Sequence, residues 1–357
     1  MKPNILLLGA GADQLPMIKK ALELGWGVIG FDADPKAPGI PGLNHFECVD
    51  IRDPDVVEAL ALKVNKKIGI NAVMAPATEV GISCGRVVDK LGLLGIGEKA
   101  AELLTDKVYR RAKFDKLRIS QPKWSTPGND WNIFPCVIKP RLQMAAIGVR
   151  YIENSQQLKE AEDWGIVEEC LNGWEISTEA LIINPMVSLI AHADRNYSEK
   201  LKYKPAIIEN GCSFPSRISP LILKKIDNIV GKVAKELNLS NCACKLDVLV
   251  KDNLVYILEF APRLGGGKLS SVMIPGVTGL DWWGTALNLA CGISMPKFPT
   301  SPVQGKFCVQ RYIFPEIVKN HKDRTGSHEA FANTYEEALK KAEEKVNANG
   351  SFRANHQ

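Results

Sequence analysis

Apolar runs and helical patterns alternate along the N-terminal part of the chain. Residues 4–8 and 28–31 are short apolar runs of the kind that form buried strands, and residues 14–24 carry apolar positions at helical spacing. The alternation continues with strand-like residues 45–49 and 72–75 on either side of a helical pattern at 54–64. Strands that alternate with helices predict parallel βαβ units. We therefore expect a Rossmann-like domain over residues 1–97.

The pattern changes after residue 97. Residues 98–120 have helical patterns, and most later segments are strand-like, which predicts an α+β arrangement. The expected strands are residues 136–139, 148–152, 166–167, 175–183, 185–194, 206–209 and 306–314. The expected helices are residues 155–162, 220–237, 280–290 and 334–347. In residues 220–237, Ile222, Ile226 and Val230 share one face, which indicates a helix packed on the core.

Two β-rich runs, residues 244–250 and 254–260, are separated by a polar Lys-Asp-Asn segment that predicts a hairpin. The alternation of a strand places Asp247 and Glu259 on one face, at neighbouring positions. Two carboxylates a few ångströms apart repel each other unless a cation lies between them. Carboxylate oxygens suit Mg²⁺, which completes its coordination with water and substrate phosphates. The alternative, a surface hairpin with solvated charges, is disfavoured because these acidic residues interrupt apolar sequence.

Composition narrows the function classes. The chain has 357 residues, 45% hydrophobic and 24% charged, which is ordinary for a globular protein of two or three domains. Its net charge of +5 is spread along the chain, so no basic block points to nucleic acid. No stretch approaches the ~20 apolar residues of a membrane span. Nine cysteines in scattered apolar contexts favour reduced thiols and a cytoplasmic location.

Several basic residues and a glycine run predict an anion site. Lys139 ends an apolar strand, where a buried ammonium is costly unless an anion meets it. Arg263 offers a planar fork that matches phosphate or carboxylate. The following Gly265-Gly266-Gly267 allows backbone N–H groups to approach an anion closely.

The first strand is followed by a glycine turn that partly matches a dinucleotide fingerprint. Gly9 and Gly11 are present, but Gln14 replaces the third glycine of that fingerprint. Asp32 falls where an acidic residue could bind a ribose hydroxyl. These features support an NAD(P)-dependent oxidoreductase only weakly.

The segment Glu259-Phe-Ala-Pro-Arg263 resembles the metal-binding strand pair of the ATP-grasp superfamily, whose second strand ends in Glu-x-Asn-x-Arg. Ala261 stands where the family usually has Asn, which would supply an oxygen to a second Mg²⁺. The resemblance extends over almost the whole chain, and the most similar members in style are carbamoyl-phosphate-synthase-like enzymes and carboxylate–amine ligases. It implies a Rossmann-like pre-ATP-grasp domain (1–97) and a two-subdomain ATP-grasp fold. The first subdomain, with its phosphate loop, would span 98–183, and the second, with the metal-binding hairpin and a C-terminal cap, 184–357.

The resemblance also implies roles for single residues. Lys107 and Lys139 match the family's two nucleotide lysines. Glu168 opens the strand that binds the adenine edge, a segment that includes Leu171, and Glu175, seven residues after Glu168, matches the glutamate that binds ribose. The resemblance implies metal ligands at Asp247 and Glu259, and catalytic roles for Arg263, Lys139 and Lys268.

Further implications concern the substrate side. In the family, a glycine turn with a nearby Gln borders the acceptor-substrate cleft, and we favour this interpretation over a dinucleotide site. Glu79, at the end of a strand in the same domain, is a candidate substrate contact. Asp194 and Arg195 either line the phosphate or acceptor pocket or only end a strand.

The implied activity is ligation. ATP with Mg²⁺, or Mn²⁺ as an alternative ion, would activate a small-molecule carboxylate as an acylphosphate that an amine attacks. The loop at 141–148 keeps only Gly148 where relatives have several Gly and Ser, and Ala261 is a second departure. These departures support the alternative of an ATP-binding sensor without ligase activity. No nucleic acid or membrane partner is expected, and a homodimer is left open.

Overall fold

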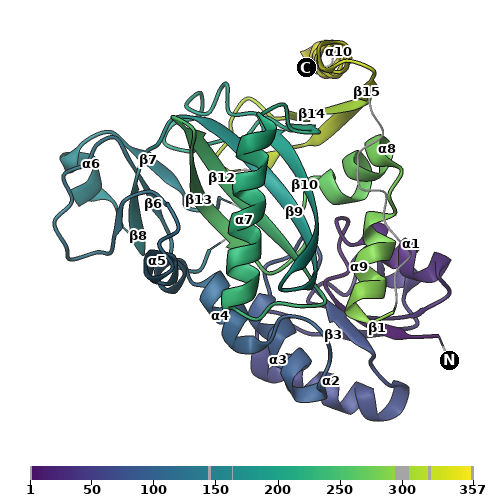
Figure 1. The fold of residues 1–357 in the computed structure, drawn as a ribbon. Coiled ribbons are helices and arrows are strands. Elements are labelled where there is room, and N and C mark those ends of the chain that lie inside the picture. Colours follow the sequence, from purple (N-terminus) through teal and green to yellow (C-terminus); the bar gives the residue numbers. More distant parts are fainter. Residues whose placement is uncertain (1, 144–145, 163, 294–304, 321–322, 355–357) are drawn as a thin grey trace.

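The computed structural model describes residues 2–143, 146–162, 164–293, 305–320 and 323–354. Its strands form three sheets (Figure 1). Within these described ranges, no helix is both long and apolar enough to cross a membrane.

The first sheet is parallel and has the order β3-β2-β1-β4. Its strands are β1 (Asn4–Leu8), β2 (Gly27–Asp32), β3 (His45–Cys48) and β4 (Ala72–Met74). The helices of this part are α1 (Leu15–Glu23), α2 (Pro54–Ile68) and α3 (Gly81–Leu91), with a short 3-10 turn, η1 (Ile40–Gly42). Helix α2 begins where predicted because the Asp53 carboxylate accepts from the N–H of Asp55 and of Val56 at 3.1 and 3.2 Å. The predicted βαβ pattern is confirmed.

The second sheet is antiparallel and projects from one side of the molecule (Figure 1). Its order is β5-β8-β6-β7, with β5 (Trp124–Ser125), β6 (Cys136–Lys139), β7 (Arg150–Ile152) and β8 (Ile166–Glu169). The associated helices are α4 (Glu98–Thr105), α5 (Lys107–Lys116) and α6 (Ser155–Glu160).

The third sheet is antiparallel, with the order β13-β12-β9-β10-β11-β14-β15. Its strands are β9 (Trp174–Asn184), β10 (Val187–Arg195), β11 (Cys212–Phe214), β12 (Cys242–Lys251), β13 (Leu254–Ala261), β14 (Phe307–Ile313) and β15 (Gly326–Ala332). The helical elements here are α7 (Pro220–Glu236), a π-helical turn η2 (Leu269–Met273), α8 (Ile274–Thr278), α9 (Trp282–Ala290) and α10 (Tyr335–Ala354). The expected strand at 206–209 is wrong: β11 forms instead, and Ala206 makes only an isolated bridge to Arg150.

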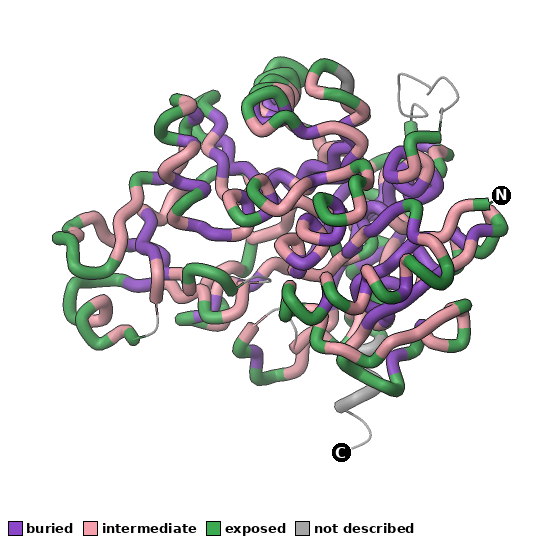
Figure 2. The backbone as a smooth tube through the Cα atoms, turned by 90° about the horizontal axis from the view of Figure 1, so that it is seen from below, coloured by how far each residue is buried: buried purple, intermediate pink, exposed green. Residues whose placement is uncertain are grey.

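The two faces of the large sheet are covered differently. Helix α7 lies across one face (Figure 1), where Ile226 and Val230 pack in one core cluster with Ile182 and Cys244. On the other face, Leu181 packs with residues of α9, η2 and α1 in a second cluster. Figure 2 shows these buried segments running through the middle of the molecule. Further along the second face, the inward positions of β9 and β12 become polar, and the site described below lies there.

The predicted hairpin is confirmed, including its turn. Asp252 and Asn253 adopt φ values of 51° and 60°, and residues with short polar side chains tolerate this left-handed conformation. The register shifts between Asp247 and Val248, so Asp247 is opposite Glu259 while Val248 is opposite Ile257. The bulge therefore places the two carboxylates directly across from each other.

We propose that the chain divides near residue 97 and again before Trp174. Strand β9 pairs with β10 and β12 over its length, so its residues belong with the large sheet and not with the four-stranded sheet before it. A boundary at 183 would cut this strand near its end.

Gly85 generates a prediction for the junction of α3 and α4. A Cβ atom on Gly85 would lie 2.8 Å from the backbone N of Glu98 and 2.8 Å from the carbonyl C of Gly97. Gly85→Ala should therefore destabilise the fold by about 1–3 kcal/mol through overpacking. Gly231→Ala on α7 is the matched control, because nothing lies within 4 Å of its added Cβ. It should stabilise the fold by up to about 1 kcal/mol through helix propensity. Thermal unfolding measures both, and equal shifts would contradict close packing at Gly85.

Candidate active site

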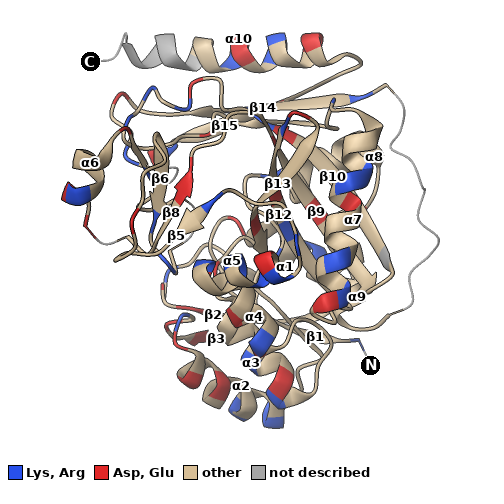
Figure 3. Ribbon diagram, turned by 60° about the vertical axis from the view of Figure 1, so that its left-hand side comes forward, with Lys and Arg blue, Asp and Glu red and all other residues tan. Residues whose placement is uncertain are grey.

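A cleft of about 420 Å³ lies where the three parts of the chain meet. This volume is within the ~300–1,000 Å³ of ordinary ligand pockets. Figure 3 shows basic and acidic segments together in the interior, near α5, β8, β12 and β13. The charged residues that line the cleft are Asp13, Glu79, Lys107, Arg110, Lys139, Glu168, Glu169, Glu175, Glu179, Arg195, Lys200, Glu209, Lys245, Asp247, Glu259, Arg263 and Arg324.

The predicted metal ligands Asp247 and Glu259 both line this cleft. Asp247 is buried and accepts hydrogen bonds from Ser177 Oγ at 2.8 Å, Arg195 Nη1 at 2.9 Å and Lys245 Nζ. Burial alone would raise the pKa of Asp247, but Arg195 and Lys245 outweigh it and lower that pKa to about 2. Lys245 Nζ also lies 3.7 Å from Glu259 Oε2, and although burial opposes the change, this ammonium lowers the pKa of Glu259.

Glu168 lies at the centre of a buried network of ion pairs. Arg111 Nε and Nη2 donate to its Oε1 at 2.9 and 2.8 Å, and Lys139 Nζ donates to its Oε2 at 2.6 Å. Burial opposes ionisation, but the two cations lower the pKa of Glu168 to about 2. Arg111 also donates to the carbonyls of Ile257 and Leu258 at the bulge of β13. The Glu168 side chain is therefore paired within the protein through both of its oxygens.

The first turns of α5 supply further cations. Lys107 is buried and its Nζ donates to the carbonyl of Gln143, while burial and the nearby Arg110 lower its pKa to about 8. Arg110 Nη1 donates to the Leu104 carbonyl at 2.8 Å, and its Nε has no partner among the described residues. Residues 107, 110 and 111 share one helical face, of which the resemblance had singled out only Lys107. Arg110 was therefore missed, although its helical spacing from Lys107 was a usable signal.

A short segment after β8 forms another wall of the cleft. Glu169, Cys170 and Leu171 line the cleft. The N–H of Glu169 donates to the Lys123 carbonyl at 2.9 Å, and the N–H of Cys170 donates to the Pro135 carbonyl at 3.2 Å. Glu175 lies beyond this segment at the start of β9. Burial raises the pKa of Glu175 to about 7, although Arg195, 4.0 Å away, opposes the shift.

The glycine run and Arg263 connect the first domain to the large sheet. Arg263 pairs with Glu79, and burial lowers its pKa to about 10. Gly266 and Gly267 line the cleft, while the N–H of Gly265 donates to Glu179 Oε1 at 2.8 Å. The other oxygen of Glu179 is buried without a partner in the described part of the chain, and burial raises the pKa of this carboxyl to about 8.

Lys268 is placed differently from the prediction. It adopts φ 70° just before η2, and this left-handed conformation turns its side chain toward β15. Its Nζ donates to Glu329 Oε2 at 2.8 Å, with 45% of the side chain exposed, and it does not line the cleft. This position does not support the catalytic role that the resemblance implies for Lys268.

Positions in the structure bear on two alternatives that the sequence left open. Arg195 lines the cleft. Asp194, at the end of β10, instead accepts hydrogen bonds from the Ser216 hydroxyl and the Arg217 N–H. In the glycine turn, Asp32 accepts from the N–H groups of Ala10 and Asp34 at 2.6 and 2.9 Å.

Gln14 lies against the same turn. A Cβ atom at Gly9 or Gly11 would come within 3.2 or 3.0 Å of its side chain, and its Nε2 donates to the Pro76 carbonyl at 2.7 Å. Asp32 and Gln14 therefore stabilise the turn itself, which disfavours a dinucleotide site. Asp13, next to Gln14, lines the central cleft.

The predicted phosphate loop lies at the rim of the cleft. Gln143, Ala146 and Val149 line it, while residues 144 and 145 lie outside the described residues. Arg141 Nε donates to Asp106 Oδ2 at 2.6 Å, and Asp106 also caps α5, so the start of the loop is fixed to that helix.

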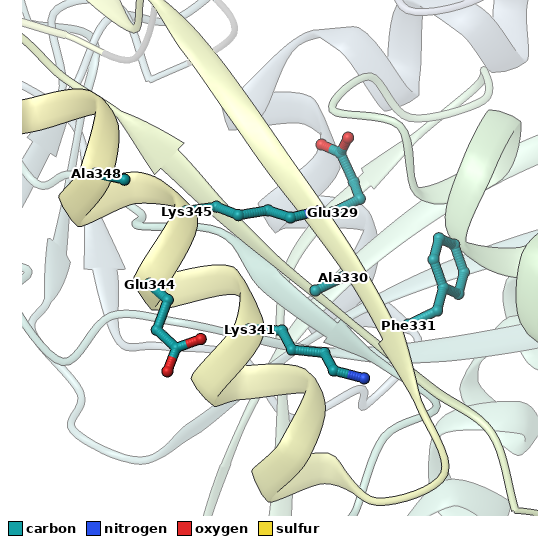
Figure 4. A pocket seen from close by; sticks show the side chains of 7 residues that line it. All are labelled: Glu329, Ala330, Phe331, Lys341, Glu344, Lys345 and Ala348. Carbon is teal, nitrogen blue, oxygen red and sulfur yellow. The ribbon is translucent and has the colours of Figure 1, made fainter. Parts of the chain in front are cut away.

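A second hollow, between β15 and α10, has a volume of about 580 Å³ (Figure 4). It is lined by Glu329, Ala330 and Phe331 of β15 and by Lys341, Glu344, Lys345 and Ala348 of α10. None of the predicted site residues lines this hollow, so the central cleft is the candidate active site.

Comparisons with known proteins agree with this geometry. Residues 104–267 match the family model described as an ATP-grasp domain. The formate-dependent phosphoribosylglycinamide formyltransferase of Bacteroides thetaiotaomicron is 22% identical over 313 residues, covering 82% of this chain and 78% of that protein. A D-alanine–D-alanine ligase of Pseudothermotoga lettingae is 27% identical over 298 residues, covering 77% of this chain and 86% of that protein. The crystal structure of phosphoribosylglycinamide synthetase from Anaerococcus prevotii superposes with a TM-score of 0.78 at 21% identity, covering 97% of this chain and 98% of that one.

The expected fold class is confirmed by these matches, together with the parallel N-terminal sheet and the two antiparallel sheets that follow it. The resemblance to ATP-grasp proteins is therefore not confined to Glu259–Arg263 but extends over much of the chain. The chain carries an ATP-grasp domain at residues 104–267 and is of the ATP-dependent carboxylate–amine ligase type.

Proposed function

We propose that the central cleft binds ATP with Mg²⁺ and joins a small-molecule carboxylate to an amine. The observation that carries this proposal is the convergence of Lys107, Lys139 and Arg263 on the Asp247–Glu259 pair in one cleft. Buried cations beside a carboxylate pair form a site for phosphate and a divalent ion.

The residues present fit both groups. Among the described residues, no three His, Cys, Asp or Glu side chains are arranged to hold a metal ion by themselves. Two carboxylates are enough for Mg²⁺, which usually takes its remaining ligands from phosphates and water. The buried Nε of Arg110 lies close to Lys107 and has no hydrogen-bond partner in the part of the chain that the structure describes, which further favours an anion at this end of the cleft.

Each side chain has a separate task in the proposed reaction. The backbone of the segment that ends at Leu171 contacts the adenine edge, and the Glu175 carboxylate accepts from the ribose hydroxyls. Lys107 and Lys139 bind the phosphates. Asp247 and Glu259 would hold Mg²⁺, which supplies positive charge at the transferring phosphoryl group.

The chemistry runs in two steps. A carboxylate oxygen of the substrate attacks the γ-phosphorus of ATP, the bond to the β-phosphate oxygen breaks, and ADP leaves. The amine then attacks the carbonyl carbon of the acylphosphate, inorganic phosphate leaves with the bonding electron pair, and the nitrogen loses a proton. Arg263 binds the anionic oxygens during both steps, so its guanidinium stabilises charge that develops in the transition states.

Ala261 and the glycine-poor loop at 141–148 favour a second candidate, a protein that binds ATP without ligation. Formation of ADP with a panel of carboxylates and amines separates the two. Turnover that requires both substrates supports the ligase. Tight ATP binding without turnover for any pair in the panel favours the second candidate.

Nucleotide choice gives a direct test. ATP with Mg²⁺ at ~100 times its dissociation constant should stabilise the fold by roughly 2.7 kcal/mol, and NADH or NADPH should not. Thermal unfolding with each ligand measures this difference. A midpoint raised by NADH and unchanged by ATP with Mg²⁺ would overturn the assignment.

Lys139 is the phosphate contact to test. Lys139→Ala should raise the dissociation constant of ATP at least ~10-fold and nearly abolish ADP formation, because a charge-assisted phosphate contact is lost. The fold should remain intact, since Arg111 still pairs with Glu168. Lys159→Ala on the nearby helix α6 is the control and should change neither quantity. Unchanged ATP affinity in folded Lys139→Ala would place the phosphates elsewhere.

Glu175 predicts a pH dependence. Its pKa of about 7 means that it is mostly protonated at pH 6 and ionised at pH 8. Ribose hydroxyls donate better to a carboxylate than to a neutral acid, so ATP affinity should rise with pH by up to about tenfold across this window. Glu175→Gln does not titrate, so any dependence that remains in it belongs to other groups. The same slope in both proteins would contradict a role for Glu175.

A further inference from the structure

Lys245 lies at the centre of the carboxylate cluster and was not identified from the sequence. It faces Ala261 on β13 and Glu179 on β9 in the strand register. Two residues along β12, on the same face, Asp247 lies opposite Glu259. Lys245 is therefore surrounded by carboxylates of three adjacent strands.

The contacts of Lys245 bridge the proposed metal ligands. Its Nζ donates to Asp247 Oδ2 and lies 3.7 Å from Glu259 Oε2. Only 15% of its side chain is exposed.

Small residues next to Lys245 leave room for its long side chain. Ala261 is fully buried and has no polar side-chain atom. A Cβ atom on Gly265 would lie 3.1 Å from Lys245 Cδ and 2.3 Å from Glu179 Oε1, so a side chain there would crowd both. The small residues at 261 and 265 thus leave room for a long cation where an Asn at 261 would otherwise offer an oxygen.

The space between the two carboxylates already holds a cation. Asp247, Glu259 and Glu209 carry three negative charges, and Lys245 and Arg195, which lies 2.9 Å from Asp247 and 2.7 Å from Glu209, carry two positive ones. Because Lys245 Nζ contacts Asp247 and lies 3.7 Å from Glu259, it occupies a position between the proposed metal ligands. The cluster therefore accommodates one divalent ion better than two.

We propose that the Lys245 ammonium takes the place of the second divalent cation, so that the cleft binds one Mg²⁺ with each ATP. This inference rests on the proposed function. In this role Lys245 contacts the phosphate oxygens directly and acts as a catalytic residue. The replacement of Asn by Ala261 is then matched by a cation from the neighbouring strand, and the site remains competent for phosphoryl transfer.

The test counts metal ions. Mn²⁺ bound per molecule of a non-hydrolysable ATP analogue is measured by electron paramagnetic resonance and equilibrium dialysis. The wild type should bind one Mn²⁺, and so should Lys245→Arg, which keeps the charge. The double variant Lys245→Met/Ala261→Asn should bind two, because an oxygen ligand replaces the cation. Lys251→Met, at the exposed end of β12, is the control and should match the wild type.

Turnover supplies the second measurement. Lys245→Met alone should reduce ADP formation at least ~10-fold, with its thermal midpoint near that of the wild type. Two Mn²⁺ ions in the wild type, one in the double variant, or unchanged turnover in Lys245→Met would each overturn the role of Lys245 while leaving the ligase assignment intact. A wild type that does not bind the analogue would overturn the proposed function itself.

Discussion

The buried network around Glu168 is the interaction on which the rest of the site depends. Arg111 connects this carboxylate to the carbonyls of Ile257 and Leu258, and Lys139 reaches it from β6. One cluster thereby fixes α5, the small sheet and the bulge of the hairpin relative to one another. Removing one partner of a buried ion pair destabilises the fold by about 3–5 kcal/mol, because the other charge is left unpaired. Arg111, Glu168 and Lys139 therefore hold one another in position. The bulge in turn places Glu259 opposite Asp247, so the position of the proposed metal ligands depends on the Arg111–Glu168 ion pair.

The large sheet explains why the polar cluster can exist next to a core. Leu181 on β9 and Ala243 on β12 pack under α9, and the same face becomes polar at Glu179, Ser177 and Lys245. Successive inward positions of a strand lie on one face, so a strand can leave a packed core and enter a cleft without changing direction. Buried charges are tolerated there because many of them have a partner of opposite sign. Among the described residues that line the cleft, three buried side-chain atoms have no hydrogen-bond partner: one oxygen of Glu179 and the Nε atoms of Arg110 and Arg263.

The first domain closes the cleft through few but specific contacts. Glu79 pairs with Arg263, and the N–H of Ala77 donates to the Leu264 carbonyl at 3.2 Å. Asp13 reaches the cleft from the turn that Gln14 and Asp32 stabilise. A glycine turn that resembles a dinucleotide-binding turn thus contributes Asp13 to the lining of the cleft, while most of the lining comes from the chain after residue 97.

The sequence by itself determined the features that depend on local periodicity and spacing. It predicted the βαβ start, the hairpin, the facing pair Asp247 and Glu259, and the position of Lys139 at the end of its strand. Only the tertiary structure decided which charges are buried and what they contact. Arg110 and Arg111 look like solvated residues of a charged helix until β8 and β13 pack against it, and Lys268 turns away because of one left-handed backbone angle. Lys245 lies between two carboxylates only because β9, β12 and β13 pair in one register. The partner of a buried charged side chain comes from a segment that is distant in sequence, so no local sequence pattern can predict it.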